Sequence, residues 1–282
     1  MIESLWILLL VGISSSLLGN ILVQKQTVMV ADAISHTILL GIVLAYFIVQ
    51  NLDSPLLIIG ATLFGVLTVY AIEWLTYQTN IQIDAAIGIV YTFFFALAVI
   101  LISKCFDNVH LDIDAVLLGE IIFAPLNRVE LLGHSFPVAL IQNTILLGII
   151  LLFLFLFYHP LKLILFDSTF AKTTNVKVSL INFLLMTLVA LHCVIAFQSV
   201  GAILVIALMV APALSAQLYA KSFPQLLIFG AMIACINSAI GYQLAIHINV
   251  SMSGMVAIVS FIVFIMVFIL KHHILSLFRR LS

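Results

Sequence analysis

The sequence predicts an all-α integral membrane protein, a polytopic helical bundle of about nine (eight to nine) transmembrane helices with a short cytoplasmic helix between two of them. Hydrophobic residues make up 65% of the 282 residues and charged residues only 7%, whereas a soluble domain carries about 25% charged residues. The apolar residues gather in segments of about 20 residues, the length that crosses a bilayer. Because these segments follow one another along the whole chain, residues 1–282 are expected to form a single transmembrane domain.

The segments that satisfy this length criterion cover residues 4–23, 28–49, 55–76, 84–103, 137–158, 179–198, 200–220, 225–247 and 251–271. The first is interpreted as a membrane span. It is too long and uniform for the apolar core of a signal peptide, and it lacks a basic start.

The basic residues predict the orientation, because Lys and Arg concentrate in cytoplasmic loops. With the N-terminus outside, eight of the ten basic residues lie in the cytoplasm and only Lys104 and Arg128 lie outside. The opposite orientation would invert this bias. An odd number of spans then places the C-terminus in the cytoplasm.

Several functions are disfavoured by what the sequence lacks. The net charge of −1 gives no reason to expect a nucleic-acid partner. A GxxxxGK[ST] motif, which would hold nucleotide phosphates, is absent, so ATP-driven work needs a partner protein. No HExxH motif or other catalytic constellation occurs, and the cysteines show no CxxC spacing. The chain is therefore expected not to be an enzyme and to hold no permanently bound cofactor.

Asp32 and His36 lie in the second predicted span and are the candidate metal ligands. Ionisable residues inside a membrane are costly and are functional candidates by default. A spacing of four residues places both side chains on one face of a helix. A carboxylate with an imidazole, and no thiolate nearby, suits Mn²⁺, Fe²⁺ or Zn²⁺. Two ligands are too few for tight binding, which suits a transported ion, and a second subunit would supply two more.

The alternatives to this interpretation are structural. Asp32 can be interfacial if the helix begins near Val28, and a lone membrane histidine often hydrogen-bonds to a neighbouring carbonyl. Other polar residues in or near the spans are weaker candidates. Glu73 and Asp84 are better explained as solvated groups near cytoplasmic helix ends, and His192 and His247 could line an access path. The set is Glu73, Asp84, His192, Asn237 and His247.

Two connections between spans are long. Residues 104–136 are expected to form an external loop with five acidic and two basic residues, either a solvated amphipathic loop or a docking surface. Residues 159–178 are expected to form a cytoplasmic segment with a short amphipathic helix along the membrane, for which Asp167 or Ser168 is available as the N-cap.

The seventh predicted span contains Pro212, which removes a helical hydrogen bond and predicts a kink or break. Such helices often line cavities in transporters. An ordinary kinked packing helix explains the same residues equally well. Gly201 and Pro212 are therefore candidate pathway or kink residues.

In these stretches the chain resembles the permease subunits of bacterial manganese, zinc and iron ATP-binding-cassette importers. The similar stretches are residues 30–36, 111–121, 166–167 with Ala171, 199–205 and 211–213. The resemblance implies a BtuC-like type II importer architecture in the bacterial cytoplasmic membrane. It implies a second permease subunit (a homodimer or heterodimer), a cytoplasmic ATP-binding-cassette ATPase and an external metal-binding protein.

The resemblance also implies roles for particular residues. Asp32 and His36 would coordinate the transported ion, and Phe166, Asp167 and Ala171 would belong to a coupling segment seated on the ATPase. The expected function is the permease of an ATP-driven importer of Mn²⁺, or of Zn²⁺ or Fe²⁺, working by alternating access. An ATP-independent secondary metal transporter or channel is the alternative.

Overall fold

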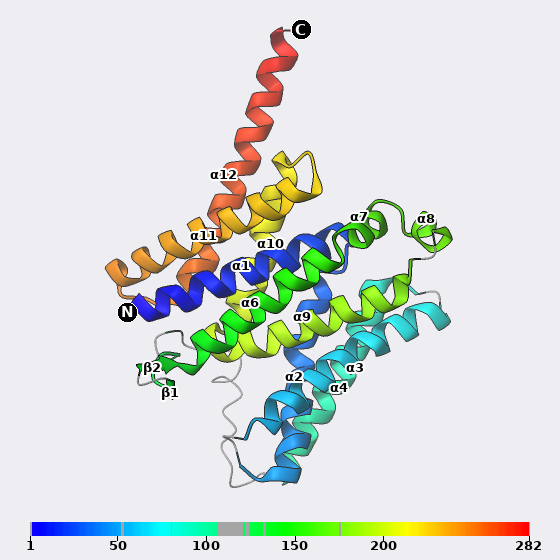
Figure 1. The fold of residues 1–282 in the computed structure, drawn as a ribbon, viewed down its shortest axis with the longest axis vertical. Helices are drawn as coiled ribbons and strands as arrows, with labels where there is room; N and C mark the ends of the chain where they lie inside the picture. Colours follow the sequence, from blue (N-terminus) through cyan, green and yellow to red (C-terminus); the bar gives the residue numbers. More distant parts are fainter. Residues whose placement is uncertain are drawn as a thin grey trace. The chain divides into compact units, whose positions relative to one another are not determined.

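The computed structural model describes residues 2–51, 54–79, 81–105, 121, 124–131, 134–174 and 176–281. These residues form a helical protein with one two-stranded sheet (Figure 1). Within them, nine helices are long and apolar enough to cross a membrane. These are α1 (Ile2–Gln24), α2 (Met29–Val49), α3 (Leu56–Thr79), α4 (Ile83–Cys105), α6 (Val138–Leu156), α9 (Val178–Val200), α10 (Ala202–Tyr219), α11 (Phe223–Ile248) and α12 (Met252–Leu281).

The predicted spans agree with these helices to within a few residues at nearly every end. The second span, predicted over 28–49, is helix Met29–Val49. The main difference is at the C-terminus, where the span predicted to end at residue 271 belongs to a helix that continues to Leu281. The apolar stretch ends near residue 271, but helical hydrogen bonding continues through the basic segment that follows.

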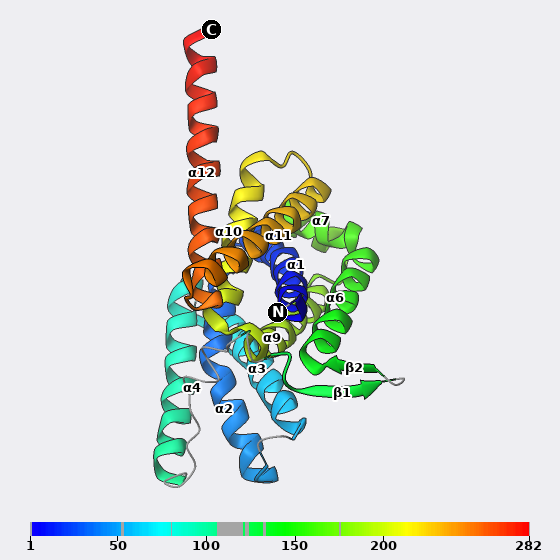
Figure 2. The same cartoon turned by 90° about the vertical axis from the view of Figure 1, so that its left-hand side faces the viewer.

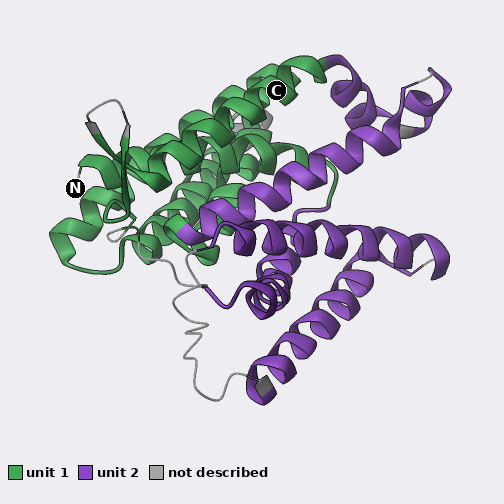
Figure 3. Ribbon diagram, turned by 60° about the horizontal axis from the view of Figure 1, so that its bottom comes forward, with its two compact units in different colours: residues 1–26, 120–158, 199–282 green, residues 27–119, 159–198 purple. Residues whose placement is uncertain are grey.

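The helices divide between two compact units (Figure 3). Unit 1 comprises residues 1–26, 120–158 and 199–282, and it contains α1, α6, α10, α11, α12 and the sheet. Unit 2 comprises residues 27–119 and 159–198, and it contains α2, α3, α4, the short helices α7 (Tyr158–Phe166) and α8 (Ser168–Thr173), and most of α9.

Helix α1 forms the core of unit 1. It packs against α6, α10 and α11, which surround it when it is viewed near its axis (Figure 2). Small residues allow close approach of helices in a membrane, and Gly19 shows this directly. A Cβ atom on Gly19 would lie only 2.0 Å from the carbonyl oxygen of Met209 in α10. The backbones of α1 and α10 therefore touch at a position that only glycine can occupy.

In unit 2, helices α2, α3 and α4 pack together and position the candidate metal ligands. A Cβ atom on Gly41 of α2 would lie 2.4 Å from the carbonyl oxygen of Gly60 in α3. The hydroxyl of Thr68 in α3 donates a hydrogen bond of 2.7 Å to the buried hydroxyl of Thr37, which lies one turn before Gly41 on α2. Backbone contact and a buried hydrogen bond together hold α2 against α3.

Two short antiparallel strands, which the sequence did not predict, pair before α6. Strand β1 (Arg128–Leu131) pairs with β2 (His134–Pro137), and Arg128 stands opposite Pro137. Arg128 also makes a two-pronged ion pair with Glu3 at the start of α1, with N–O distances of 3.0 and 2.8 Å. The external-loop acids Asp107, Asp112, Asp114 and Glu120 lie outside the described residues.

The segment predicted to contain one short amphipathic helix contains two. Helix α7 ends at Phe166, and Asp167 adopts an extended conformation with φ −153° and ψ 101°. Its carboxylate accepts hydrogen bonds of 2.9 Å from the backbone N–H groups of Thr169 and Phe170. Asp167, and not Ser168, is therefore the N-cap of α8. The chain turns at Asp167 because its side chain satisfies the amides of the new helix.

Candidate metal site

The sequence places Asp32 and His36 one turn apart on α2, and the structure brings their side chains together. Nε2 of His36 lies 3.9 Å from Oδ1 of Asp32. This separation is too long for a direct hydrogen bond. Nitrogen and oxygen ligands bind Zn²⁺ at about 2.0–2.2 Å, so two atoms this far apart can contact one ion between them. The pair has the geometry of half a metal site.

The pair is accessible from outside the chain. The side chain of His36 is 35% exposed and that of Asp32 is 45% exposed, although the residues on either side of both, such as Ala31 and Thr37, are buried. Asp32 lies in the first turn of α2, where the helix dipole favours a negative charge. The hydroxyl of Ser35 donates to the backbone oxygen of Asp32 at 2.6 Å, so this turn of the helix is itself constrained.

Two aromatic rings of α4 hold the imidazole of His36. The ring centroid of His36 lies 5.4 Å from that of Tyr91 and 5.6 Å from that of Phe95, the latter in an edge-on arrangement. Tyr91 and Phe95 are themselves one turn apart on α4. Sequence reasoning missed both residues, since their i, i+4 spacing shows a shared helix face but not what that face contacts.

A small cavity lies beside His36 within unit 2. Its volume is about 20 Å³, which is room for about one water molecule. Its lining is mostly apolar and consists of Ser35, His36, Ile38, Leu39, Ile42, Phe95, Val194, Phe197 and Gln198. Gln198 of α9 is the other polar side chain that reaches this cavity besides Ser35 and His36. The imidazole thus borders a space that admits water but not a hydrated ion.

The other candidates are distributed over the chain. Glu73 in α3 and Asp84 in the first turn of α4 are exposed, and His247 is exposed in the last turn of α11. His192 in α9 and Asn237 in α11 are fully buried. Among the residues that the structure describes, no three His, Cys, Asp or Glu side chains gather into a group that could hold a metal. Asp32 and His36 stand as a pair.

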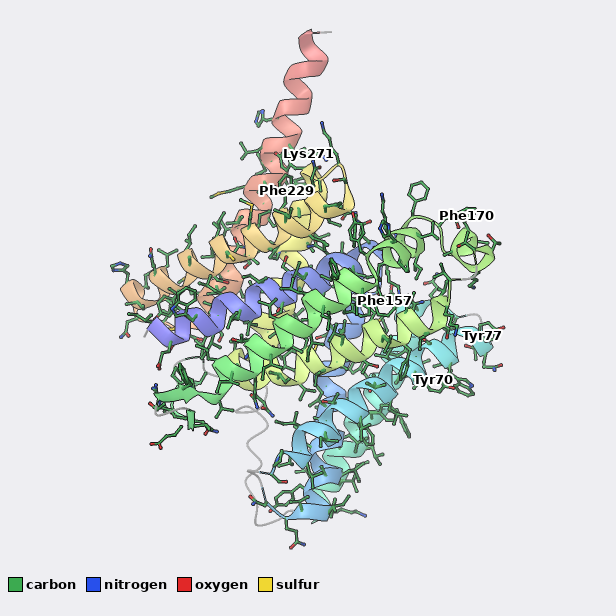
Figure 4. The ribbon with its side chains drawn as sticks, in the orientation of Figure 1. Tyr70, Tyr77, Phe157, Phe170, Phe229 and Lys271 are labelled. Carbon is green, nitrogen blue, oxygen red and sulfur yellow. The ribbon has the colours of Figure 1, made fainter. Side chains whose placement is uncertain are left out.

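The short helices present an exposed aromatic surface. Phe166 is 92% exposed and Phe170 is 53% exposed, whereas Ala171 is fully buried. Figure 4 labels Phe170 on α8. A broad, open hollow of about 670 Å³ lies beside this surface, lined by His159, Pro160, Lys162, Leu163, Phe166, Thr174 and Val176. The two exposed phenylalanines and this hollow together form the candidate contact surface of the segment.

Gly201 separates α9 from α10 and has φ 86° and ψ 155°, a backbone conformation that favours glycine. The end of α9 just before this turn is held by two hydrogen bonds, since Asn143 donates to the hydroxyl of Ser199 at 3.1 Å and Ser253 donates to the backbone oxygen of Val200 at 2.9 Å. Pro212 lies inside α10, which continues unbroken from Ala202 to Tyr219. The break in the helical chain is therefore at Gly201, between α9 and α10, and not at Pro212.

The fold and the candidate site define the class of protein. It is a multi-pass helical membrane protein that carries a carboxylate and an imidazole as a pair on one of its spans. Residues 1–271 match the model of the ABC 3 transport family, and the chain belongs to this family. It is a membrane permease subunit of that transporter type. The resemblance seen in the sequence and the predicted fold class are both confirmed.

Named relatives extend over almost the whole chain. The zinc transport system membrane protein TroD of Treponema pallidum (strain Nichols) is 39% identical over 268 residues, covering 95% of this chain and 73% of TroD. The manganese transport system membrane protein MntD of Bacillus subtilis (strain 168) is 39% identical over 258 residues, covering 89% of this chain and 86% of MntD.

A solved structure shares the fold. It is PsaBC from Streptococcus pneumoniae in complex with Fab, with a TM-score of 0.76 and 29% identity, covering 94% of this chain and 90% of the solved chain.

Proposed function

We propose that this permease passes a divalent transition-metal ion, Mn²⁺ or else Zn²⁺ or Fe²⁺, from an external metal-binding protein to the cytoplasm by alternating access. Its N-terminus would lie outside and its C-terminus in the cytoplasm. A separate ATPase would hydrolyse the ATP, and the permease would hold no permanent cofactor. The observation that carries the proposal is the pair of ligand atoms 3.9 Å apart on α2, in a family whose relatives are named for zinc and manganese transport.

The ligand chemistry supports a transported transition metal. A carboxylate and an imidazole accept Mn²⁺, Fe²⁺ and Zn²⁺, whereas Cu⁺ prefers thiolate and thioether ligands and Ca²⁺ prefers oxygen alone. One chain supplies two ligands, which bind an ion weakly enough to release it. A second permease subunit, like or unlike this one, would bring a second pair to the same ion and complete four-fold coordination.

The exposed surface on α7 and α8 supports contact with an ATPase. Phe166 and Phe170 project from short helices that lie between two membrane spans. Asp167 fixes the angle between these helices by capping α8, and buried Ala171 anchors α8 to its own unit. Residues 159–178 would therefore transmit the movement of the ATPase to the spans on either side. Phe166 would be the contact and Asp167 the residue that positions it.

Gly201 and Pro212 are proposed as pathway or hinge residues. Gly201 allows the sharp turn between α9 and α10. Pro212 has no backbone N–H, so the carbonyl four residues before it lacks its helical partner. A missing hydrogen bond in a membrane helix lowers the cost of bending there.

The test uses the complete transporter, with the permease pair and its ATPase in proteoliposomes. Uptake of radioactive manganese and zinc is measured with ATP, without ATP, and with a partner ATPase disabled in its nucleotide site. The proposal expects uptake with ATP and the active ATPase only. Uptake of equal rate without ATP would instead show an ATP-independent transporter or channel.

A further inference from the structure

An apolar groove lies between three helices of unit 1, at the end of α10 where the chain turns into α11. Its volume is about 180 Å³. The lining comes from α10, α11 and α12 and consists of Ser215, Ala216, Tyr219, Phe229, Met232, Ile233, Ile236 and Val267. Phe229 and Ile236 lie seven residues apart on α11, so the groove runs about 10 Å along that helix.

Two lysines stand at one end of this groove. Lys221 follows the groove residue Tyr219 by two positions, and Lys271 follows the groove residue Val267 by one helical turn. The hydroxyl of Tyr219 lies 3.5 Å from the backbone oxygen of Val267, which places both lysines at the same end. Figure 4 labels Phe229 and Lys271 in this part of the unit. The backbone N–H of Lys221 donates to Oε1 of Gln225 at 2.9 Å, which fixes the turn that carries Lys221.

The same end carries the N-terminus of α11, a helix of 26 residues. Its N-cap, Ser222, makes no side-chain hydrogen bond to the first turn. Pro224 in this turn has no N–H, so the positive potential that attracts anions comes from the helix dipole and from the amide groups of the other residues of the turn. Positive potential from a helix terminus therefore adds to that of Lys221 and Lys271.

The surrounding sequence supplies no negative charge to neutralise these groups. No Asp or Glu occurs anywhere in residues 168–282, which include α10, α11 and α12. The other acids of unit 1 are Glu3, which is paired with Arg128, Glu130 on β1, and Glu120, which lies outside the described residues. Two cations, a helix N-terminus and an apolar groove therefore share one location, and the counter-charge must come from outside these helices.

We propose that this groove binds one anionic phospholipid, with an acyl chain along α11 and the phosphate between Lys221, Lys271 and the first turn of α11. The groove suits a hydrocarbon chain because nearly all of its lining side chains are apolar. The lysines suit a headgroup with net negative charge, since basic pockets between membrane helices bind such headgroups. A zwitterionic lipid would bring its own cation to the lysines and gain less from them.

The experiment is native mass spectrometry of the complete transporter, released from nanodiscs that contain equal amounts of phosphatidylglycerol and phosphatidylcholine. The wild-type complex is expected to retain phosphatidylglycerol preferentially. Each lysine near a membrane surface contributes roughly five-fold in affinity for anionic lipid. The double variant Lys221→Gln with Lys271→Gln should therefore lose the preference, and Met232→Trp should lose lipid of both kinds by filling the groove.

The control is Lys104→Gln, which removes a positive charge from an exposed position in the last turn of α4, in unit 2 and outside residues 159–178. It should retain phosphatidylglycerol like the wild type. Equal retention of the two lipids by the wild type would overturn the proposal, and so would an unchanged preference after loss of Lys221 and Lys271. Disulfide crosslinking of Met232→Cys between two copies of the chain in nanodiscs would place a second subunit in the groove and also overturn it.

Discussion

Nε2 of His36 lies 3.9 Å from Oδ1 of Asp32, and the two side chains share one face of α2. Both are partly exposed in a helix whose other polar residues, Ser35 and Thr37, are buried and hydrogen-bonded. The two candidate ligand groups are therefore accessible, whereas the hydroxyls of Ser35 and Thr37 are buried and already hydrogen-bonded. That arrangement is what a transported ion requires, because its ligands must be reachable and must release it.

Removing the aromatic support of His36 should weaken metal transport. An aromatic pair contributes about 0.5–1.5 kcal/mol beyond its buried area, so Tyr91→Ala should lower the apparent affinity for the ion about two- to ten-fold. Tyr91→Phe retains the ring at 5.4 Å from His36 and should transport like the wild type. The measurement is uptake rate against metal concentration. If Tyr91→Ala has the same apparent affinity for the ion as the wild type, the imidazole of His36 needs no support from Tyr91.

The buried hydrogen bond between Thr68 and Thr37 should contribute measurably to stability. Thr68 donates to Thr37 at 2.7 Å and both side chains are fully buried. Hydrogen bonds between membrane helices contribute on average about 0.6 kcal/mol and at most about 1.7 kcal/mol. A double-mutant cycle with Thr37→Val and Thr68→Val, read by thermal unfolding in detergent, should give a coupling in this range. Additive effects would indicate that the hydroxyls do not interact.

Close packing of α2 on α3 should make Gly41 intolerant of any side chain. A Cβ atom there would lie 2.4 Å from the carbonyl oxygen of Gly60, and such overpacking costs about 1–3 kcal/mol. Gly41→Ala should therefore lower the melting temperature in detergent. The matched control is Gly148→Ala in α6, where no atom lies within 4 Å of the new Cβ. That variant should be neutral or more stable, and equal melting of the two proteins would refute the packing argument.

The cap of α8 should matter for coupling. Asp167 accepts two backbone hydrogen bonds of 2.9 Å, and replacing such an N-cap by alanine costs about 0.5–2 kcal/mol. In the complete transporter, Asp167→Ala should lower the number of ions moved per ATP hydrolysed. Asp167→Asn retains an accepting oxygen and should keep most of the coupling. If Asp167→Ala moves as many ions per ATP hydrolysed as the wild type, Asp167 has no role in transmitting the movement of the ATPase to the spans.

Most of the fold could be predicted from the sequence because a bilayer imposes a simple length rule on apolar segments. The division of residues 179–220 into two spans followed from that rule, and the structure places the turn at Gly201. The pairing of β1 with β2 could not be predicted, since it depends on contacts between the strands and on the distant contact of Arg128 with Glu3. Nor does Pro212 break α10. A proline removes only one hydrogen bond, and the remaining helical hydrogen bonds continue through residue 212.

The site was predictable to the extent that it is local. The spacing of Asp32 and His36 along α2 is enough to place both on one face, and Asp167 was one of two predicted caps. Tyr91, Phe95 and Gln198 could not be found in this way, because Tyr91 and Phe95 contact His36 from α4 and Gln198 lines the adjacent cavity from α9. Such contacts depend on how helices pack, which hydropathy does not encode.

The most direct test is metal uptake by the complete transporter carrying Asp32→Asn or His36→Ala, measured for both manganese and zinc. Membrane insertion and assembly with the ATPase are checked in each variant, and Glu73→Gln serves as the charge-matched control on an exposed acid of the same unit. We predict uptake at background level for both variants with normal assembly, and wild-type uptake for the control. Wild-type uptake in the Asp32 and His36 variants would contradict their role as ligands.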